Sequence, residues 1–382
     1  MAQETQALPR NLAELMAKLD AEGITDYRRF KEIRSYLDFK SREKLIPIKG
    51  TFELTPLCNL DCKMCYVHLN RDQLKGASLL TVEQWKDLMQ QAIDGGMMFA
   101  SITGGECLTY PGFKELYLYL QARGIQINIL SNGILMNEDM VEFLKVNRPA
   151  LIQVTVYGAS EEGYEKVTGR REFARVMKNI TALKDAGIPL TIAITPNEFM
   201  DDGVELVHYL SQKGFTCSVN SGIMSPHENT GRGLHDAALM TYVDIMKAWR
   251  DETGNELYPQ CDEEDLPAVG GNGEHVKGVK CAAGRSAFAI GWDGLMRPCN
   301  MFPCEPQKVL EMGFSTAWKK LNEIATNFAT PVECDGCIYQ RSCKHCVVEH
   351  ASGAPIGHAN PRTCEWVKCM IKEGIYRFSP ND

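Results

Sequence analysis

Long hydrophobic runs and blocks of positive charge are both missing from this 382-residue sequence. No apolar stretch approaches the roughly 18 residues that a membrane-spanning helix needs, so we expect no membrane segment. The net charge is −8 and no Lys/Arg block exceeds a few residues, which argues against a surface that follows nucleic-acid phosphates. Residues 1–10 are polar and lack the apolar core of a secretion signal, which favours a cytoplasmic, reducing location.

Cysteine is the residue that the sequence has in excess. There are fifteen cysteines, an odd number, and most stand in short, tight clusters. In a reducing compartment such clusters favour metal or iron–sulfur ligation over a disulfide framework. With 44% apolar and 24% charged residues, the composition is otherwise that of an ordinary globular protein.

The sequence divides into three regions. Residues 1–49 are charged and have a helical pattern, with Leu12, Leu15 and Leu19 at helical spacing, so we expect a helical extension packed over a larger domain. A peptide-binding clamp of winged-helix type would need more residues than this. Residues 50–235 alternate β-rich runs with amphipathic helical stretches. Residues 236–382 lack this alternating pattern and contain ten of the fifteen cysteines.

The middle region predicts six βα units. Strands are expected at residues 51–55, 99–103, 126–130, 151–156, 190–194 and 216–219. Helices are expected at residues 81–94, 112–123, 138–146, 172–186 and 202–213. Such a series implies right-handed crossovers and a parallel sheet. The predicted fold class is α/β, a partial (β/α)6 barrel with a loop-rich, cluster-binding C-terminal domain, and a flat doubly wound sheet is the alternative. In both, the functional loops follow the carboxyl ends of the strands.

A compact cysteine motif follows the first strand. Cys58, Cys62 and Cys65 stand in the pattern Cys-x3-Cys-x2-Cys. Three thiolates can hold three irons of a [4Fe–4S] cluster and leave the fourth iron open, as a catalytic metal site requires. The alternative is a partial zinc site with a fourth ligand such as His68.

Two further motifs stand at strand ends. Thr103-Gly104-Gly105-Glu106 follows the second predicted strand, and Ser131-Asn132-Gly133 follows the third. Together with the cysteine motif they resemble the radical S-adenosylmethionine (radical SAM) superfamily over about residues 51–220. The resemblance implies a catalytic [4Fe–4S] cluster on the three cysteines, with S-adenosylmethionine on its open iron.

The resemblance also implies contacts to S-adenosylmethionine. Gly104, Gly105 and Glu106 are expected at its amino group, and Ser131 and Asn132 near its ribose. Ile194, with Ile192, would flank the adenine, although core packing is the alternative for both. Arg170 or Arg171 would pair with the carboxylate, unless these are solvated surface charges. Met64 replaces the aromatic residue common in the family and is expected against the adenine, and Cys107 replaces a common proline.

The C-terminal cysteines form a second pattern. Cys-x2-Cys-x5-Cys-x2-Cys on its own would also suit a zinc ribbon. In context it resembles the SPASM extension of radical SAM enzymes, which implies two auxiliary [4Fe–4S] clusters. The resemblance assigns one cluster to Cys334, Cys337, Cys343 and Cys364, and the other to Cys281, Cys299 and Cys346. The fourth ligand of the latter is Cys261 or Cys304, or the site is open to substrate.

The resemblance implies an oxidoreductase that cleaves S-adenosylmethionine reductively to a 5′-deoxyadenosyl radical and abstracts hydrogen from a peptide or protein. Products would be a thioether, a carbon crosslink or an oxidised residue. Formylglycine formation is disfavoured, because Asn300 stands where those enzymes carry an aspartate and an amide is no general base. Asp293 and Glu305 lie nearby in sequence, and the base is left open.

Other functions and partners follow from the same sequence. Dehydrogenation of a small molecule and a non-catalytic metal-binding scaffold are the alternative functions. Expected partners are a peptide or small protein substrate, an electron donor such as flavodoxin or ferredoxin, and a separate peptide-recognition protein.

Overall fold

A computed structural model describes most of the chain, namely residues 21, 27–69, 72–74, 76–220, 239–254, 257–258, 277–340, 342–343 and 346–378. The helical repeat expected at residues 12–19 and the candidate ligand Cys261 lie outside the described residues. In the part of the chain that is described, no helix combines the length and the apolar character that crossing a membrane requires.

The six strands that the sequence predicts are all present and parallel to their neighbours. They are β1 (Lys49–Glu53), β2 (Phe99–Thr103), β3 (Gln126–Ser131), β4 (Leu151–Thr155), β5 (Leu190–Ile194) and β6 (Cys217–Val219). The spatial order follows the sequence from β1 to β6, as expected when each crossover packs beside the previous one. The predicted α/β fold class is confirmed.

Three further strands come from the cysteine-rich region and were not expected. They are β7 (Ala287–Ile290), β8 (Leu295–Arg297) and β9 (Gln307–Lys308). β7 pairs in parallel with β1, and β8 and β9 follow it in antiparallel hairpins. The described strands therefore form one sheet in the order β6-β5-β4-β3-β2-β1-β7-β8-β9, and the C-terminal region contributes one edge of it.

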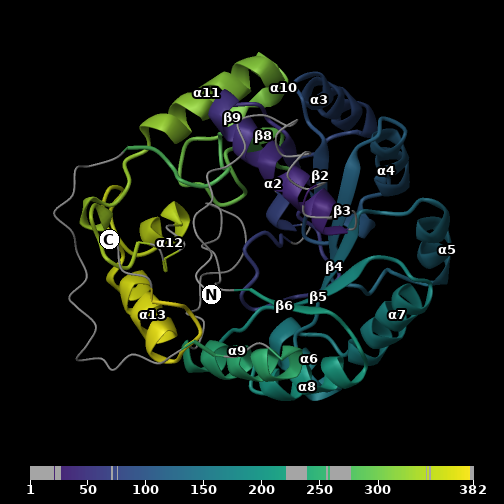
Figure 1. Ribbon diagram of the computed structural model, residues 1–382. Coiled ribbons are helices and arrows are strands. Elements are labelled where there is room, and N and C mark those ends of the chain that lie inside the picture. The colour runs from purple at the N-terminus through teal and green to yellow at the C-terminus, as the bar shows by residue number, and fades with distance from the viewer. Residues whose placement is uncertain are drawn as a thin grey trace.

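Helices cover the outer face of the curved sheet. Figure 1 shows them along an arc from α3 to α9, with α12 and α13 at the opposite side. The helices of the βα region are α3 (Val82–Asp94), α4 (Phe113–Gln121), α5 (Glu138–Val146), α6 (Glu161–Thr168), α7 (Phe173–Asp185) and α8 (Gly203–Gln212). Of these, only α6 is not predicted by the sequence. It extends from its cap Ser160 to Gly169, which is in the left-handed conformation.

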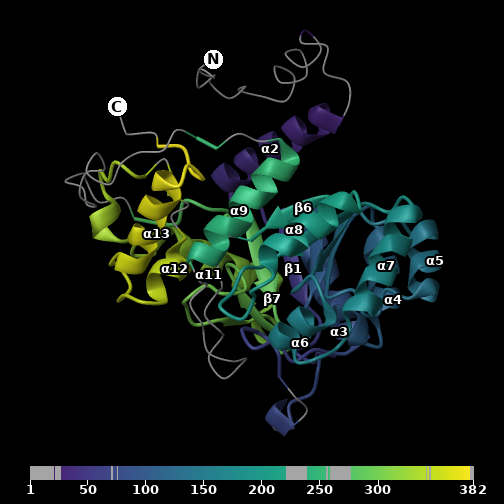
Figure 2. The same ribbon diagram turned by 90° about the horizontal axis from the view of Figure 1, so that it is seen from below.

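The remaining helices belong to the two ends of the chain. They are α2 (Tyr27–Lys44), α9 (Leu239–Thr253), α10 (Val309–Met312), α11 (Phe314–Asn327), α12 (Val347–Ala351) and α13 (Pro361–Lys372), with the short 3-10 turns η1 (Asp72–Leu74), η2 (Cys107–Thr109) and η4 (Val332–Cys334). Figure 2 shows α8 and α9 next to each other, and η1 standing away from the body of the molecule.

α2 is attached to the start of the sheet by a polar cluster. The Asp38 carboxylate forms an ion pair of 2.7 Å with Lys49 and accepts a hydrogen bond of 3.1 Å from Ser286 Oγ. Lys49 begins β1, and Ser286 precedes β7. The cluster therefore fixes the N-terminal helix where the first strand meets the C-terminal region.

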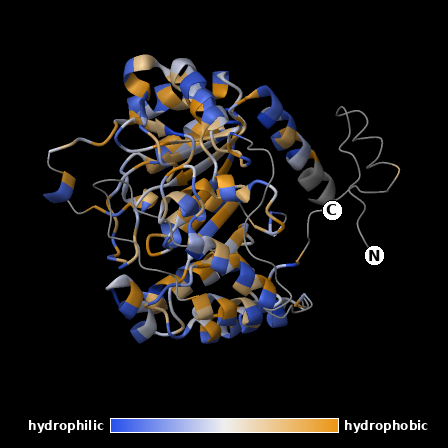
Figure 3. Ribbon diagram, turned by 90° about the vertical axis from the view of Figure 1, so that its left-hand side faces the viewer, coloured by the Kyte–Doolittle hydropathy of each residue, from blue (hydrophilic) through white to orange (hydrophobic). Residues whose placement is uncertain are grey.

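The core lies between the sheet and its helices. Hydrophobic residues are concentrated on the strands and on the helix faces turned toward them (Figure 3). Phe52 of β1 packs edge to face against Trp85 of α3 and Phe288 of β7, and all three side chains are almost fully buried. The aromatic contacts thus join the predicted barrel to the C-terminal strand.

Replacing Phe288 with alanine tests this joint core. We expect Phe288→Ala to lower the free energy of unfolding by about 3–5 kcal/mol, because a large buried ring leaves a cavity. Urea unfolding of the full chain measures the effect. Val146→Ala is the control, since Val146 is 82% exposed and its replacement should change stability little. A Phe288→Ala chain as stable as the control would mean that β7 is not part of the core.

Candidate functional site

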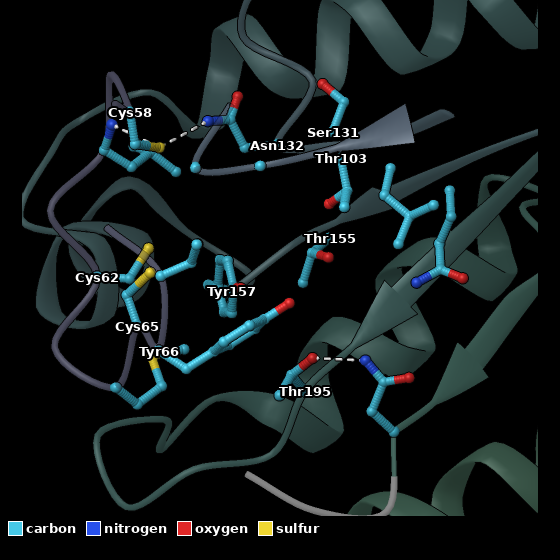
Figure 4. Close-up of a pocket in the computed structure, with 18 residues that line it drawn as sticks. Cys58, Cys62, Cys65, Tyr66, Thr103, Ser131, Asn132, Thr155, Tyr157 and Thr195 are labelled. Carbon is cyan, nitrogen blue, oxygen red and sulfur yellow. Dashed lines mark hydrogen bonds between the residues drawn. The ribbon is translucent and has the colours of Figure 1, made fainter. Parts of the chain in front are cut away.

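A cavity of about 430 Å³ opens at the carboxyl ends of the parallel strands. Its walls come from the loop after β1, the ends of β2 to β5 and the residue after β6. In Figure 4, Cys58, Cys62 and Cys65 lie on one side and Thr103, Thr155 and Thr195 on the other, with Tyr66 and Tyr157 between them. The cavity thus lies at the carboxyl ends of the strands, where the sequence analysis expects the functional loops.

The three cysteines of the first motif all line this cavity. The loop turns them inward with the help of backbone donors, since Leu60 N lies 3.4 Å from Cys58 Sγ and His68 N lies 3.2 Å from Cys65 Sγ. All fourteen cysteines in the described residues are free thiols. Backbone N–H groups that point at sulfur also stabilise the charge of a ligating thiolate.

The donor set suits a cubane cluster. Three sulfur atoms face one open space, and cysteine is the usual ligand of [4Fe–4S] clusters. Within the described ranges, no three His, Cys, Asp or Glu side chains are spaced to hold a single metal ion. The His68 ring, the suggested fourth zinc ligand, lies 3.6 Å from the Asp61 carboxylate and is not among the described residues that line the cavity.

The two glycines after β2 pack directly under the cysteine loop. Gly105 N donates to Thr55 O at 2.7 Å, and Glu106 N donates to Leu57 O at 2.9 Å. A Cβ atom at Gly104 would lie 2.4 Å from Thr55 O, and one at Gly105 would lie 2.5 Å from Leu57 O. Side chains are therefore excluded at both positions, which explains the Gly-Gly pair in physical terms.

Glu106 is fully buried and lies behind the cavity wall. Its carboxylate accepts hydrogen bonds from Ser131 Oγ at 3.0 and 3.1 Å, from Asn132 N at 2.8 Å and from Leu108 N at 3.2 Å. Burial raises the pKa of Glu106, while these donors oppose the shift. In this structure Glu106 fixes the loop after β3, and a direct contact to S-adenosylmethionine stays a prediction.

The predicted cofactor residues divide into two groups. The cavity is lined by Met64, Gly104, Gly105, Ser131 and Asn132. Asn132 Nδ2 donates to Asn59 Oδ1 at 2.6 Å and lies 3.6 Å from Cys58 Sγ.

The second group lies elsewhere. Arg170 is exposed and Ile194 is completely buried, and neither is among the described residues lining the cavity. Ile192 pairs with Val154, whereas the cavity residue Thr155 pairs with Ala193. Because side chains alternate along a strand, Ile192 and Ile194 face the helices. Arg171 pairs with Glu162 and Glu165 on the surface.

Several cavity residues were not predicted from the sequence. They come from strand ends and from the cysteine loop, and they are Tyr66, Thr103, Gln153, Thr155, Tyr157, Thr195 and Asn220. Asn220 Nδ2 donates to Thr195 Oγ1 at 2.8 Å. The detectable signal was Gln153 and Thr155, two polar residues that alternate with Ile152 and Val154 on a buried strand. None of the described residues that line the cavity is Asp, Glu, Lys, Arg or His.

A buried carboxyl group was also missed. Glu53 ends β1 and accepts a hydrogen bond of 2.6 Å from Asn300 Nδ2 in the C-terminal region. Burial raises the pKa of Glu53 to about 7, and the Asn300 hydrogen bond and the charge of Arg297 oppose that shift. The Tyr66 side chain, which lines the cavity, shares a hydrogen bond with the same Asn300.

The C-terminal cysteines gather in two places. Cys334, Cys337, Cys343 and Cys364 line one small cavity between η4 and α13. Burial raises the pKa of Cys334 to about 12, and the other three thiols of this set add to the shift. These four residues are the set that the resemblance assigns to one auxiliary cluster.

The other three assigned cysteines, Cys281, Cys299 and Cys346, lie together at the second place. Burial raises the pKa of Cys299 to about 12, and the neighbouring Cys281, Cys346 and Cys304 contribute to the shift. Cys299, Cys304 and Cys346 all pack around the small hydrophobic cluster that includes Phe302. Cys304 thus lies beside the predicted triad, and Cys261 is outside the described residues.

Comparison with known proteins finds the superfamily that the sequence motifs resemble. Residues 52–210 match the model of the radical SAM superfamily. The chain is 27% identical over 274 residues to the subtilosin biosynthesis protein AlbA of Bacillus subtilis (strain 168), and 32% identical over 165 residues to the sporulation killing factor maturation protein SkfB of the same strain. These alignments cover 69% and 43% of this chain, but only 57% and 39% of the relatives.

Solved structures resemble the fold over most of the chain. Streptococcus suis SuiB bound to its precursor peptide SuiA superposes with a TM-score of 0.63 at 17% identity, covering 92% of this chain and 87% of that one. The anSMEcpe structure with bound AdoMet superposes with a TM-score of 0.58 at 15% identity, covering 84% and 96%. At such low identity the likeness concerns the fold.

The buried Glu53 predicts a specific pH dependence of stability. Its pKa rises from an ordinary 4.5 to about 7 on folding, so the folded protein holds a proton that the unfolded chain releases, and stability falls as pH rises through this range. Glu53→Gln should remove this fall and gain on the order of 3 kcal/mol relative to wild type between pH 4 and pH 8. Urea unfolding across that range measures it, and parallel curves for the two proteins would contradict the buried carboxyl.

Proposed function

We propose that this chain modifies a peptide or small protein oxidatively, because residues 52–210 match the model of the radical SAM superfamily and the cysteine-rich C-terminal region resembles the SPASM type. The substrate would lose hydrogen and gain a thioether or carbon crosslink, or an oxidised residue. The observation that carries the proposal is the shared cavity, in which three thiols and the Gly-Gly loop face the same space.

The residues present fit the implied cofactors. Cys58, Cys62 and Cys65 would hold a [4Fe–4S] cluster, which supplies the electron that cleaves S-adenosylmethionine. Gly104 and Gly105 line the cavity, and because neither has a side chain, S-adenosylmethionine would pass close to their backbone. Asn132 donates toward Cys58 and so orients the ligand loop.

The rest of the wall protects and positions a substrate. Leu60, Met64, Val67 and Leu130 form its apolar part, which excludes water from a reactive radical. Thr103, Gln153, Thr155, Thr195 and Asn220 form its polar part. Hydroxyl and amide groups of this kind donate to and accept from peptide backbone, which carries one donor and one acceptor per residue.

The absence of charge among the described lining residues supports a peptide over a small molecule. A free amino acid or amino-alcohol carries an ammonium or carboxylate, and burying an unpaired ion is costly. A residue within a peptide chain presents neutral amides instead. The relatives named above as biosynthesis and maturation proteins, and the structure of SuiB with a precursor peptide, also favour a peptide.

The C-terminal cysteines complete the proposal. The four-cysteine cavity and the triad with Cys304 beside it would each hold an auxiliary [4Fe–4S] cluster. Such clusters accept single electrons, which suits a net oxidation of the substrate. A flavodoxin- or ferredoxin-type donor would supply the starting electron, and a separate protein would present the peptide.

Cleavage of S-adenosylmethionine is the first prediction of this function. The anaerobically reconstituted chain, given S-adenosylmethionine and dithionite, should release 5′-deoxyadenosine, and Cys58→Ala should reduce the release to background because the cluster loses a ligand. Chromatography with mass detection measures the nucleoside. An iron-replete wild-type protein that releases none would instead favour the metal-binding scaffold.

The substrate class is decided by a second measurement on the same proteins. Co-expression with short peptides encoded beside the gene should yield a peptide that has lost two hydrogens. The Cys58→Ala chain is the matched control and should return the peptide unchanged. Turnover of an amino-alcohol with no change in any peptide would favour the small-molecule dehydrogenase.

Iron content tests the auxiliary sites. Three [4Fe–4S] clusters require about twelve iron atoms per chain, and removal of Cys334 and Cys343 together should lower the content by about four. Cys217→Ala is the control, because this partly buried thiol lies on β6 and burial alone, with no contribution from another cysteine, raises its pKa. Iron and sulfide assays measure the content, and zinc in place of iron would contradict the cluster assignment.

A further inference from the structure

Oxidative modification removes two hydrogens from the substrate. The first leaves as an atom, taken up by the 5′-deoxyadenosyl radical. The second leaves as an electron and a proton. An iron–sulfur cluster accepts the electron, but the proton needs a base within reach. The described residues that line the cavity include no carboxylate or imidazole, so among the described residues a base is to be sought directly behind the wall.

Glu53 is a carboxyl group in that position. It stands in register opposite Thr103, which lines the cavity. Asn300 donates to its carboxylate at 2.6 Å, and the cavity-lining Tyr66 hydrogen-bonds to the same Asn300. A chain of two hydrogen bonds therefore joins the cavity residue Tyr66 to Glu53 through the Asn300 amide, which holds the carboxyl group in place, and Asn300 is next in sequence to Cys299.

The other acidic residues near the cavity wall and the β7–β8 turn either accept hydrogen bonds from other groups or are exposed to solvent. Glu106 accepts hydrogen bonds from Ser131, Asn132 and Leu108, so both of its oxygens have donors. Asp293 accepts from Leu295 N within the β7–β8 turn. Glu305 is exposed at the surface.

We propose that Glu53 accepts the proton that leaves the substrate when an electron enters the iron–sulfur cluster at Cys281, Cys299 and Cys346. Asn300 is the positioning residue, since it joins Glu53 to Tyr66. The second bond to hydrogen breaks heterolytically, and its proton converts the Glu53 carboxylate to the acid. The electron pair of that bond and the unpaired electron left by the first abstraction make three electrons: two form the new bond of the product, and one reduces the oxidised cluster. This inference rests on the proposed function, which supplies the cluster and the radical.

The surroundings of Glu53 suit a proton acceptor. Burial raises its pKa to about 7, so the carboxylate is available above neutral pH and holds a proton well once it has one. The charged and titratable groups facing it are Arg297 on β8, which lowers the pKa, Asp293 of the β7–β8 turn, which raises it, and Tyr66 of the cysteine loop. An added electron on the nearby cluster would raise the pKa further.

A redox titration without substrate tests the proposal. The reconstituted full chain is titrated between pH 6 and pH 9 with electron paramagnetic resonance as the readout. In the wild type, the ratio of reduced to oxidised auxiliary cluster at fixed potential should change by up to tenfold per pH unit above about pH 7, or about 59 mV for one electron. Glu53→Gln should abolish that dependence, because glutamine cannot take up the proton.

Two further variants make the test specific. Asn300→Leu keeps Glu53 but removes a donor that lowers its pKa, so the pH dependence should move to higher pH. Glu305→Gln removes an exposed carboxylate and should retain the wild-type dependence. A potential that does not vary with pH in the wild type, or that still varies in Glu53→Gln, would overturn the proposal.

Failure of the proposed function would be seen separately. A wild-type chain that binds its iron but releases no 5′-deoxyadenosine would contradict the proposed function. The pH dependence of the reduction potential of the auxiliary cluster would still report on Glu53. If the Glu53→Gln protein loses its iron and the other variants keep theirs, the Glu53→Gln titration cannot be used, and the Asn300→Leu titration decides. A dependence that does not move in Asn300→Leu would then count against the assigned chain of contacts.

Discussion

The close contact between two loops is the constraint on which the candidate site depends. The loop after β1 carries the three cysteines, and the loop after β2 carries Gly104 and Gly105. Backbone hydrogen bonds of 2.7 and 2.9 Å join them, and a Cβ atom on either glycine would collide with backbone oxygen. Because the contact is backbone to backbone, it fixes the cysteine loop above the sheet without depending on any side chain.

Side chains alternate along each strand, so one face of the sheet packs in the core and the other faces the cavity. On β4, Ile152 and Val154 are fully buried against the helices, whereas Gln153 and Thr155 line the cavity. Apolar burial on one face stabilises the fold, which leaves the other face free to carry hydroxyl and amide groups. Helices cover the outside, and the cavity on the polar face lies at the carboxyl ends of the strands.

The C-terminal region is part of the same structure as the barrel. β7 pairs with β1, and Phe288 packs on Phe52 inside the common core. This pairing is what brings Asn300 to Glu53 at the end of β1. The cysteine triad that includes Cys299 is thereby linked to the end of β1, because the buried carboxyl group of Glu53 is hydrogen-bonded to the residue that follows Cys299.

The sequence alone determined the six βα units, the cysteine loop and the Gly-Gly turn, because periodicity and glycine placement are local properties of the chain. Only the tertiary structure decided which residues share a space. It directed Ile194 to the core and Arg170 to the surface, and it placed Glu53 against Asn300, 247 positions apart in the chain. Contacts of this range depend on strand pairing and packing, which no local pattern specifies.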